Sequence, residues 1–494
     1  MNMKRWVRLI AAALPTLLLS GCLSSAVEWN SSTVRAALTV PTSAPVAVPV
    51  GDMYPERYAD ADIMYIDTGD IFVHKRETIR VSGAETLLTN VMTRLFTEPF
   101  MHGAQLRSAV QTSNIAIVDI EPAAFGEIGD QDMLWMWASI VQTATALPDI
   151  DYCNVLLGGR SINLGGLPGG AFGRFEVPPA LIAAQRAAEE ALLGDTLGTN
   201  RLERTISVYR AGCGEYLVAE ARTVTTDIAG LLNILFRELQ APAGAEGMSS
   251  VFPRQAAVLT ASPAIVDDGE RRLVHISLNA NLQEMLDEIS VAPWQFFGAI
   301  SLTLAGVLHD IDGIFVDVGG AQLTAFPLRG EMIEILGSVM EPGMFSGAVG
   351  QHVPLYFADA DTGKLRRTVC AVAAAVADSP YARVAALIDG PGKFANALPV
   401  APSGSTRADL LGAVIDGETV VVNLSAEFIT RCRELTVVQE RNLVYAIVNT
   451  LTEMHGVRDV RFLVNGEAGK TFGQFISIRS ALMKNPGLIV ASPG

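Results

Sequence analysis

The stretch that decides the fold is residues 420–467, VVVNLSAEFITRCRELTVVQERNLVYAIVNTLTEMHGVRDVRFLVNGE. Its apolar start, residues 420–424, predicts a buried strand. A helix is expected from Thr436, whose hydroxyl can cap the first turn while Gln439 reaches back, which is the spacing of a capping box. The apolar residues of this helix recur at helical spacing: Leu443, Val444, Ile447, Val448 and Leu451. The stretch therefore predicts a helix that covers one face of a sheet.

A second strand is expected after this helix. Gly456 ends the helix, residues 460–464 form the strand, and Asn465-Gly466 forms the turn that stops it. Before residue 420, Asp416-Gly417 predicts a tight hairpin between residues 408–415 and 418–424.

One more hairpin and helix are expected upstream. Residues 353–358 and 364–372 read as strands around the turn-type sequence Asp361-Thr362-Gly363. Ser379-Pro380 can start a helix, because Ser caps and Pro tolerates the first position, and Gly390-Pro391 discourages its continuation.

The same order of elements occurs twice earlier in the chain. In the first copy we expect strands at 62–67 and 72–81, a helix capped by Ser82 with Glu85, a strand at 115–120, a helix at 131–147 and a strand at 152–157 that ends at Gly158-Gly159. In the second copy we expect strands at 205–210 and 216–224, a helix at 227–240, strands at 256–262 and 272–278 around Asp268-Gly269, a helix at 293–309 and a strand at 314–318 that ends at Gly319-Gly320.

A recurring junction supports the repeat. Asp119-Ile120-Glu121 aligns with Asn423-Leu424-Ser425, and Ser277-Leu278-Asn279 is a looser third copy. We therefore predict an α/β (α+β) fold of three tandem modules, each a small mixed sheet with two helices packed on one side.

The last module resembles a known family. Asn423-Leu424-Ser425, Leu451-Thr452-Glu453 and Asn465-Gly466, in their strand and helix context, look like the GerMN domain of envelope lipoproteins linked with sporulation and spore germination. The resemblance implies a unit similar to ring-building modules, a place outside the cell membrane, and no catalytic residues to transfer.

The N-terminus predicts export and a lipid anchor. A basic start is followed by an apolar run at residues 9–19 that is too short to span a bilayer, as in a secretory signal. Leu19, Ser20 and Gly21 before Cys22 resemble the bacterial lipobox, so Cys22 is expected to carry the lipid. An ordinary signal peptide with a chance cysteine is the alternative. We expect a protein held on the outer face of the bacterial cytoplasmic membrane, including the space between mother cell and forespore.

The chain of 494 residues is divided by these signals as follows. We predict a signal peptide at 1–21, a tether at 22–61, module 1 at 62–175, a helical linker at 176–203, module 2 at 204–330, a linker at 331–352 and module 3 at 353–494.

Composition limits the partners. A formal net charge of −16 makes nucleic acid and anionic lipid headgroups poor partners and favours a basic protein surface. Besides Cys22, the cysteines Cys153, Cys213, Cys370 and Cys432 are widely spaced, which predicts buried apolar residues and leaves one disulfide open.

Four places in the sequence offer candidate chemistry. Residues 466–471, GEAGKT, suggest a phosphate loop, but Val464 stands where its first glycine is required, and residues 471–475 resemble 171–175, which lack Lys-Thr. The glycines of residues 158–173 predict a flexible turn. The six histidines lack ligand spacing; His275 is expected on a strand face and His455 at a helix end. Asp60, Asp62, Asp67 and Asp70, like Asp359 and Asp361, miss the calcium-loop pattern. We predict no catalytic residue, cofactor or metal.

The sequence thus favours a non-catalytic scaffold that binds other envelope or sporulation proteins and can self-associate. A lipoprotein that binds peptidoglycan fragments or germinants is the alternative, and an envelope hydrolase is a third.

Overall fold

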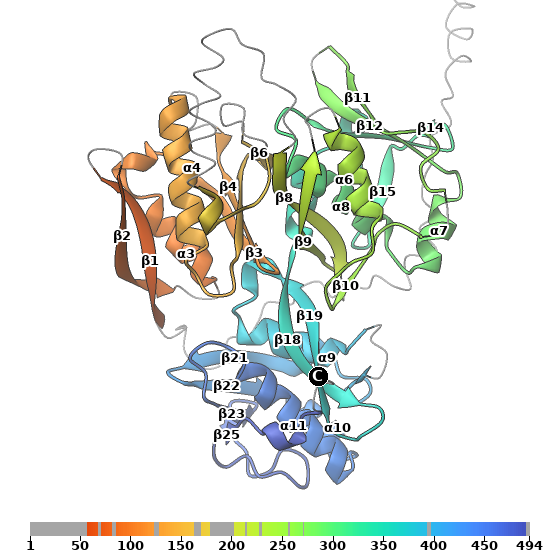
Figure 1. The fold of residues 1–494 in the computed structure, drawn as a ribbon. Helices are drawn as coiled ribbons and strands as arrows, with labels where there is room; N and C mark the ends of the chain where they lie inside the picture. Colours follow the sequence, from red (N-terminus) through yellow and green to blue (C-terminus); the bar gives the residue numbers. More distant parts are fainter. Residues whose placement is uncertain are drawn as a thin grey trace, which may run out of the picture. The chain divides into compact units, whose positions relative to one another are not determined.

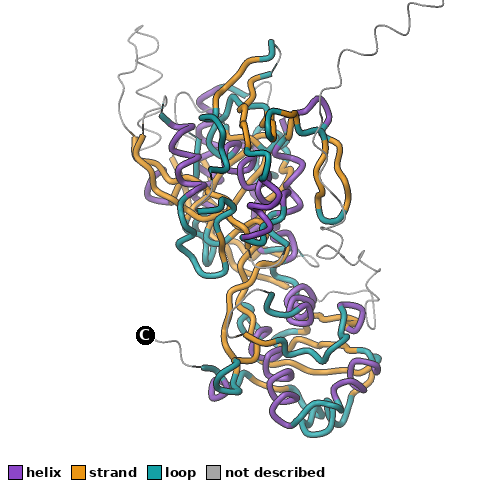
Figure 2. Tube along the Cα trace, turned by 90° about the vertical axis from the view of Figure 1, so that its right-hand side faces the viewer, coloured by secondary structure: helices purple, strands orange, loops and turns teal. Residues whose placement is uncertain are grey.

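The structure is a computed structural model that describes residues 57–67, 71–81, 85–122, 128–162, 169–177, 202–212, 215–226, 230–254, 257–269, 271–392 and 397–490. Two compact units are formed, and each is described by itself. Within the described ranges, the smaller unit holds Pro253–Trp294 and Asp312–Met340, and the larger holds the residues before Pro253, Gln295–Ile311 and those from Glu341 on. Both helices and strands make up the described residues (Figure 2), which confirms the mixed α/β class.

Module 3 lies in the larger unit and is drawn in blue shades in Figure 1. Its hairpin and helices are β18 (Gly350–Asp359), β19 (Leu365–Ala373), α9 (Pro380–Asp389), α10 (Ala426–Cys432) and α11 (Val437–Leu451). Its sheet is β21 (Leu410–Asp416), β22 (Thr419–Leu424), β23 (Asp459–Val464) and β24 (Glu467–Ala468) in that order, with β25 (Leu482–Met483) also paired to β23 and β20 (Ala397–Leu398) paired to β18. The β22–β23 pair is parallel, so α11 is its crossover helix.

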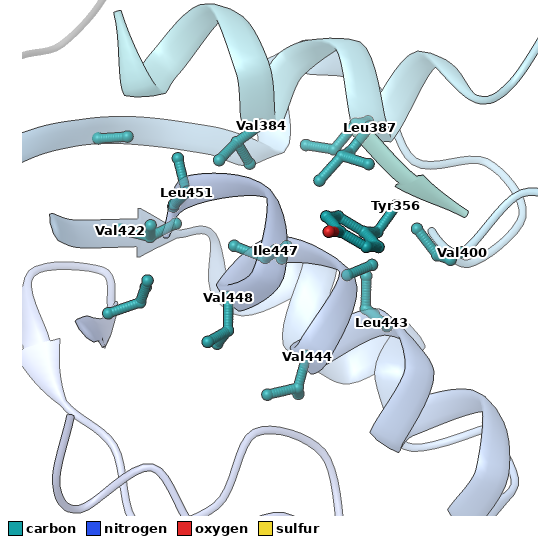
Figure 3. Packing of buried hydrophobic residues seen from close by; sticks show 14 of the residues in the cluster. Tyr356, Val384, Leu387, Val400, Val422, Leu443, Val444, Ile447, Val448 and Leu451 are labelled. Atoms are coloured by element: carbon teal, nitrogen blue, oxygen red, sulfur yellow. The ribbon is translucent and has the colours of Figure 1, made fainter. Parts of the chain in front are cut away.

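The core of module 3 forms where its two longer helices meet the strands. Val384 and Leu387 of α9 lie near Leu443 and Ile447 of α11, around the ring of Tyr356 from β18 (Figure 3). All five side chains are 1% exposed or less, as the predicted apolar face of α11 requires. The expected capping box starts this helix: Thr436 accepts from Gln439 N–H at 3.3 Å, and Gln439 Oε1 accepts from Thr436 N–H at 3.0 Å.

Module 1 repeats this plan in the larger unit. Its elements are β1 (Arg57–Asp67), β2 (Ile71–Val81), α3 (Leu87–Leu95), β3 (Leu106–Thr112), β4 (Ile115–Ile120), α4 (Asp130–Ala144), β5 (Tyr152–Leu157), β6 (Arg160–Ser161) and β7 (Phe172–Gly173). The sheet order is β3-β4-β5-β6 with β7 also paired to β5, the same order as in module 3.

Module 2 is divided between the units. In the larger unit are β8 (Leu202–Gly212), β9 (Leu217–Thr226), α6 (Leu231–Gln240), β10 (Met248–Ser249) and most of α8 (Pro293–Ala305). In the smaller unit are β11 (Ala264–Asp267), β12 (Arg272–Leu278), α7 (Leu282–Glu288), β13 (Gly313–Val318), β14 (Ala321–Gln322), a hairpin of β15 (Ala325–Leu328) and β16 (Glu331–Glu334), and β17 (Val339–Met340). Its sheet order, β11-β12-β13-β14 with β17 on β13, matches the other two.

The three sheets share their register and their closing turn. Each has six parallel residue pairs: Ile115–Ile120 with Tyr152–Leu157, Leu273–Leu278 with Gly313–Val318, and Thr419–Leu424 with Asp459–Val464. The turn after the last of these strands has positive φ at both central residues: Gly158 61° and Gly159 83°, Gly319 60° and Gly320 81°, Asn465 48° and Gly466 83°. Such angles explain why Gly or Asn stands at these places. The repeat predicted from the recurring junction is confirmed.

A buried threonine joins each crossover helix to its hairpin. Backbone N–H groups donate to threonine Oγ1 in the pairs Met64 to Thr143 at 3.0 Å, Tyr209 to Thr303 at 3.0 Å, and Tyr356 to Thr450 at 3.1 Å. All three threonines are 0% exposed. In the hairpins, the donor Met64 pairs with His74 and the donor Tyr209 pairs with Ala219. His74 of module 1 is therefore equivalent to Ala219 of module 2.

Several expected elements are corrected. The strand expected at 256–262 is β11, at Ala264–Asp267, and only Leu259 keeps a bridge to Leu278. The cap of α3 is Thr86, whose side chain accepts from Thr89 N–H, and not the expected Ser82, which lies outside the described residues. The strand β3 and the short helices α7 and α10 were not expected.

Candidate functional site

Residues 473–476, shortly after the suspected phosphate loop at 466–471, are held by a buried side chain of the protein. The carboxylate of Glu440 on α11 is 0% exposed and accepts backbone N–H bonds from Gly473 (3.1 Å), Gln474 (2.8 Å), Phe475 (3.0 Å) and Ile476 (2.8 Å). Burial by itself would raise the pKa of Glu440, but the four N–H donors outweigh it and hold the pKa below its usual value. These four N–H groups thus hold residues 473–476 on α11. In the suspected phosphate loop itself, Glu467 and Ala468 pair with β23, and Gly466 N–H donates to Asn423 Oδ1 at 2.8 Å.

Glycine is required where residues 473–476 are closest to the helix. A Cβ on Gly473 would meet Glu440 Oε2 at 2.8 Å and Cys432 O at 2.9 Å. The neighbouring Phe472 is buried, with its ring edge-on to Phe462 at 5.2 Å. The loop is therefore a structural part of module 3, as expected.

The expected equivalence of residues 471–475 and 171–175 is wrong. Phe172 and Gly173 form β7, which pairs with Cys153 and Tyr152 of β5. In module 3 the same place on β23 is taken by Leu482 and Met483 of β25. The similar sequences therefore lie at different places in the two modules.

The acidic pair near residue 360 closes a turn. Asp359 is 2% exposed and accepts from Asp361 N–H (3.2 Å), Thr362 N–H (2.9 Å), the Thr362 hydroxyl (2.7 Å) and Arg366 Nε (2.7 Å). The Thr362 hydroxyl, together with its N–H and Arg366, lowers the pKa of Asp359 despite its burial. Because both carboxylate oxygens are used, Asp359 reads as a turn residue, as expected.

In the smaller unit, His275, Ser277 and Asp317 lie together on one sheet face. His275 Nε2 and the Ser277 hydroxyl both contact Asp317 Oδ2, each at 2.7 Å. The aspartate stands between the other two, whereas a hydrolase triad needs histidine in the middle to take the serine proton. This confirms His275 as a strand-face residue and gives no nucleophile.

Other expected sites are placed as follows. Cys153, Cys370 and Cys432 are free and buried, and burial raises the pKa of the Cys153 thiol. His455 follows the end of α11. Within the described ranges no cluster of three or more His, Cys, Asp or Glu side chains could hold a metal ion.

The predicted lipobox, Leu19, Ser20, Gly21 and Cys22, lies outside the described residues, as do Cys213, Asp70 and residues 178–201 of the helical linker predicted at 176–203. Of the helices that the structure describes, none combines the length and the apolar character needed to cross a membrane.

The outer face of each sheet, meaning the face turned away from the crossover helix, is the candidate interaction surface. In module 1 this face is buried: Thr112 is 0% exposed, Ile117 6% and Asn154 1%. Parts of module 2 in the same compact unit contact it. Ala219 N–H of β9 donates to Thr112 Oγ1 at 2.9 Å, and Asn154 Nδ2 donates to the carbonyl of Gly306 at 3.0 Å.

The outer face of module 3 is open by comparison. The register puts Asp416 where module 1 has Thr112, Val421 where it has Ile117, and Arg461 where it has Asn154. Asp416 and Arg461 are exposed, and Val421 and Leu463 are half-buried. Met483 on β25 completes the face and is 62% exposed.

This face combines apolar side chains with charges of both signs. Val421, Leu463 and Met483 give apolar area, Arg461 a central cation, and the turn of Asp416 and Glu418 an acidic rim. An apolar centre with a polar rim is typical of protein-binding surfaces. Sequence analysis did not single out Arg461 or Met483, because the residues next to them in the sequence do not show whether another module covers the sheet face.

Comparison with known proteins agrees with the repeat. The family model Germane, described as sporulation and spore germination, matches residues 63–163 and 354–470. No curated protein matches the chain.

Solved structures are also matched. The tandem GerMN domains of the sporulation protein GerM from Bacillus subtilis are 15% identical, with 57% of this chain and 98% of that chain covered and a TM-score of 0.22. The first GerMN domain of that protein is 17% identical, covering 28% and 98%, with a TM-score of 0.21. A putative lipoprotein from Clostridium perfringens is 21% identical, covering 28% and 93%, with a TM-score of 0.19.

Proposed function

We propose, from the membership of residues 63–163 and 354–470 in the sporulation and spore germination family, that this chain is a lipid-anchored, non-catalytic envelope scaffold. In this proposal Cys22 carries the lipid, the residues between Cys22 and β1 act as the tether, and the three modules bind other envelope proteins outside the cytoplasmic membrane.

The observation that carries the proposal is the contrast between two equivalent sheet faces. The outer face of module 1 is buried by module 2, whereas that of module 3 leaves Arg461 and Met483 exposed. A sheet face that is covered in one module and exposed in another module is suited to bind a partner protein.

The use of the buried polar groups supports a structural role for the rest of the module. Glu440, Asp359 and Thr450 are each committed to backbone or side-chain bonds that hold loops and strands together. Groups fully engaged in this way are not poised for proton transfer or nucleophilic attack.

The test is affinity purification of the full chain from the membranes of its own cells after brief cross-linking. We expect defined envelope proteins to be captured by the wild-type chain and lost with Met483→Lys, which places a charge on the open face. Leu336→Lys is the matched control, because Leu336 is 85% exposed in the smaller unit.

Capture that is equal for all three chains would overturn the proposed role of this face. A stabilising shift in melting temperature with muropeptides or amino acids would instead favour a ligand-binding lipoprotein.

A further inference from the structure

The contact between modules 1 and 2 inside the larger unit provides a template for the open face of module 3. There the second hairpin strand of one module, β9, lies against the outer sheet face of the module before it, and Ala219 N–H donates to Thr112 Oγ1. The same sheet position in module 3 is Asp416, which also offers an oxygen acceptor.

A second copy of this chain could supply β2, the strand of module 1 that is equivalent to β9. In module 1 the corresponding strand is β2, and His74 takes the place of Ala219. Within the described residues β2 pairs only with β1, and residues 73–76 are exposed. It thus retains the edge that β9 uses.

The charges of the two surfaces are complementary. On β2, His74 is followed by Lys75 and Arg76, whose side chains are 62% and 71% exposed while they contact Glu77 and Asp60 at 2.7 and 3.4 Å. On module 3, Asp416 and Glu418 flank the hairpin turn, and Glu418 is 66% exposed while it contacts Arg458 at 2.9 Å. The corresponding turn in module 1, Thr112-Ser113-Asn114, is uncharged, as is Ala219 that contacts it.

We propose that the outer face of module 3 binds the β1–β2 hairpin of a second copy of this chain, so that copies join head to tail. This rests on the proposed scaffold function and names the partner of the same face. The two surfaces of such a contact differ, so the contact is heterologous, and repetition closes a ring or extends a filament.

Charge reversal tests the contact. The full chain with Cys22→Ser is kept in mild detergent and its association measured by sedimentation velocity over a range of concentrations. We expect concentration-dependent association that is weakened about tenfold or more by Asp416→Lys with Glu418→Lys, and equally by Lys75→Glu with Arg76→Glu, because each variant sets like charges opposite each other.

A mixture of the two double variants is the decisive measurement. Each basic face then meets an acidic hairpin, and each acidic face a basic hairpin, so association is expected to return. Glu434→Lys, an exposed position after α10, is the control and should associate like the wild-type chain. Circular dichroism confirms that every variant is folded.

A wild-type chain that stays monomeric, or folded double variants that do not associate when mixed, would overturn this inference. If envelope proteins are still captured through the open face in that case, the scaffold proposal stands without self-association. If no envelope proteins are captured but the chain still self-associates as described, the self-association proposal stands and the proposed scaffold function fails.

Discussion

The hydroxyl of Thr450 accepts the backbone N–H of Tyr356 at 3.1 Å, although 94 residues separate them. Thr143 and Thr303 do the same in their modules, so the crossover helix carries an acceptor for the hairpin three times over. The side chain is 0% exposed in each case, and water cannot replace it.

Replacing Thr450 by Val should therefore destabilise module 3. The substitution keeps the volume but leaves the N–H of Tyr356 buried without an acceptor, which costs about 1–3 kcal/mol. Urea unfolding followed by circular dichroism measures the loss. Thr452→Val is the control, since the Thr452 hydroxyl donates to Val448 O at the half-buried helix end and its removal should cost under about 0.5 kcal/mol. Equal effects of the two substitutions would contradict the assigned role.

Glu440→Gln tests the contact that holds residues 473–476 on α11. An amide keeps one acceptor oxygen but sets an NH2 group against backbone donors, so we expect a loss of about 3 kcal/mol or more in the free energy of unfolding. Glu427→Gln on the exposed side of α10 should change it by less than about 0.5 kcal/mol.

The pH dependence of the same variant gives a second readout. The folded pKa of Glu440 is lowered, so its stabilising contribution is complete above the unfolded value of about 4.3 and is lost as the pH falls through the folded pKa. The urea midpoint of the wild-type chain should drop below about pH 4.5 more steeply than that of Glu440→Gln. Parallel curves for the two chains would show that Glu440 is not ionised in the loop.

A histidine adds a pH dependence at milder acidity. Burial lowers the pKa of His352 on β18 to about 4, although a hydrogen bond with the backbone of Gly247 by itself would raise it. The unfolded chain therefore binds a proton that the folded chain excludes between about pH 6.5 and 4, and stability falls as the pH falls through that window, by up to about 1.4 kcal/mol per pH unit. His352→Gln should flatten the urea midpoint between pH 6.5 and 5, whereas His455→Gln, an exposed position, should leave the slope unchanged. A slope that persists in His352→Gln would assign it to another group.

Short-range signals explain what the sequence predicted well. The turns at Gly158-Gly159, Gly319-Gly320 and Asn465-Gly466 need residues that adopt positive φ. The cap of α11 needs Thr and Gln three residues apart. Each feature therefore depends only on a few adjacent residues. The turns mark the end of the second parallel strand in all three modules, and the cap marks the start of the crossover helix of module 3.

The features that were missed depend on distant residues. Glu440 and the N–H groups that it binds are more than 30 positions apart, and nothing in residues 473–476 reveals that a buried carboxylate binds them. The likeness of residues 171–175 to 471–475 misled the alignment because β-pairing, not local sequence, decides which segment joins β5 or β23. Exposure of Arg461 and Met483 likewise follows from which module covers which face.

The lipid anchor can be tested separately from the fold. The predicted lipobox offers one thiol for acylation, and a diacylglyceryl group adds apolar chains whose burial in the bilayer contributes about 0.8 kcal/mol per CH2. We expect the wild-type chain in the membrane fraction of cells and Cys22→Ser to lose its labelling with a radioactive fatty acid and to be released, at least in part, after osmotic lysis. Cys213→Ser removes a different cysteine and should leave both labelling and fractionation unchanged. Because the acidic body of the chain has little attraction for anionic lipid headgroups, retention of Cys22→Ser at the wild-type level would mean that an uncleaved signal or a protein partner holds the chain at the membrane, and the lipid would no longer be needed as its anchor.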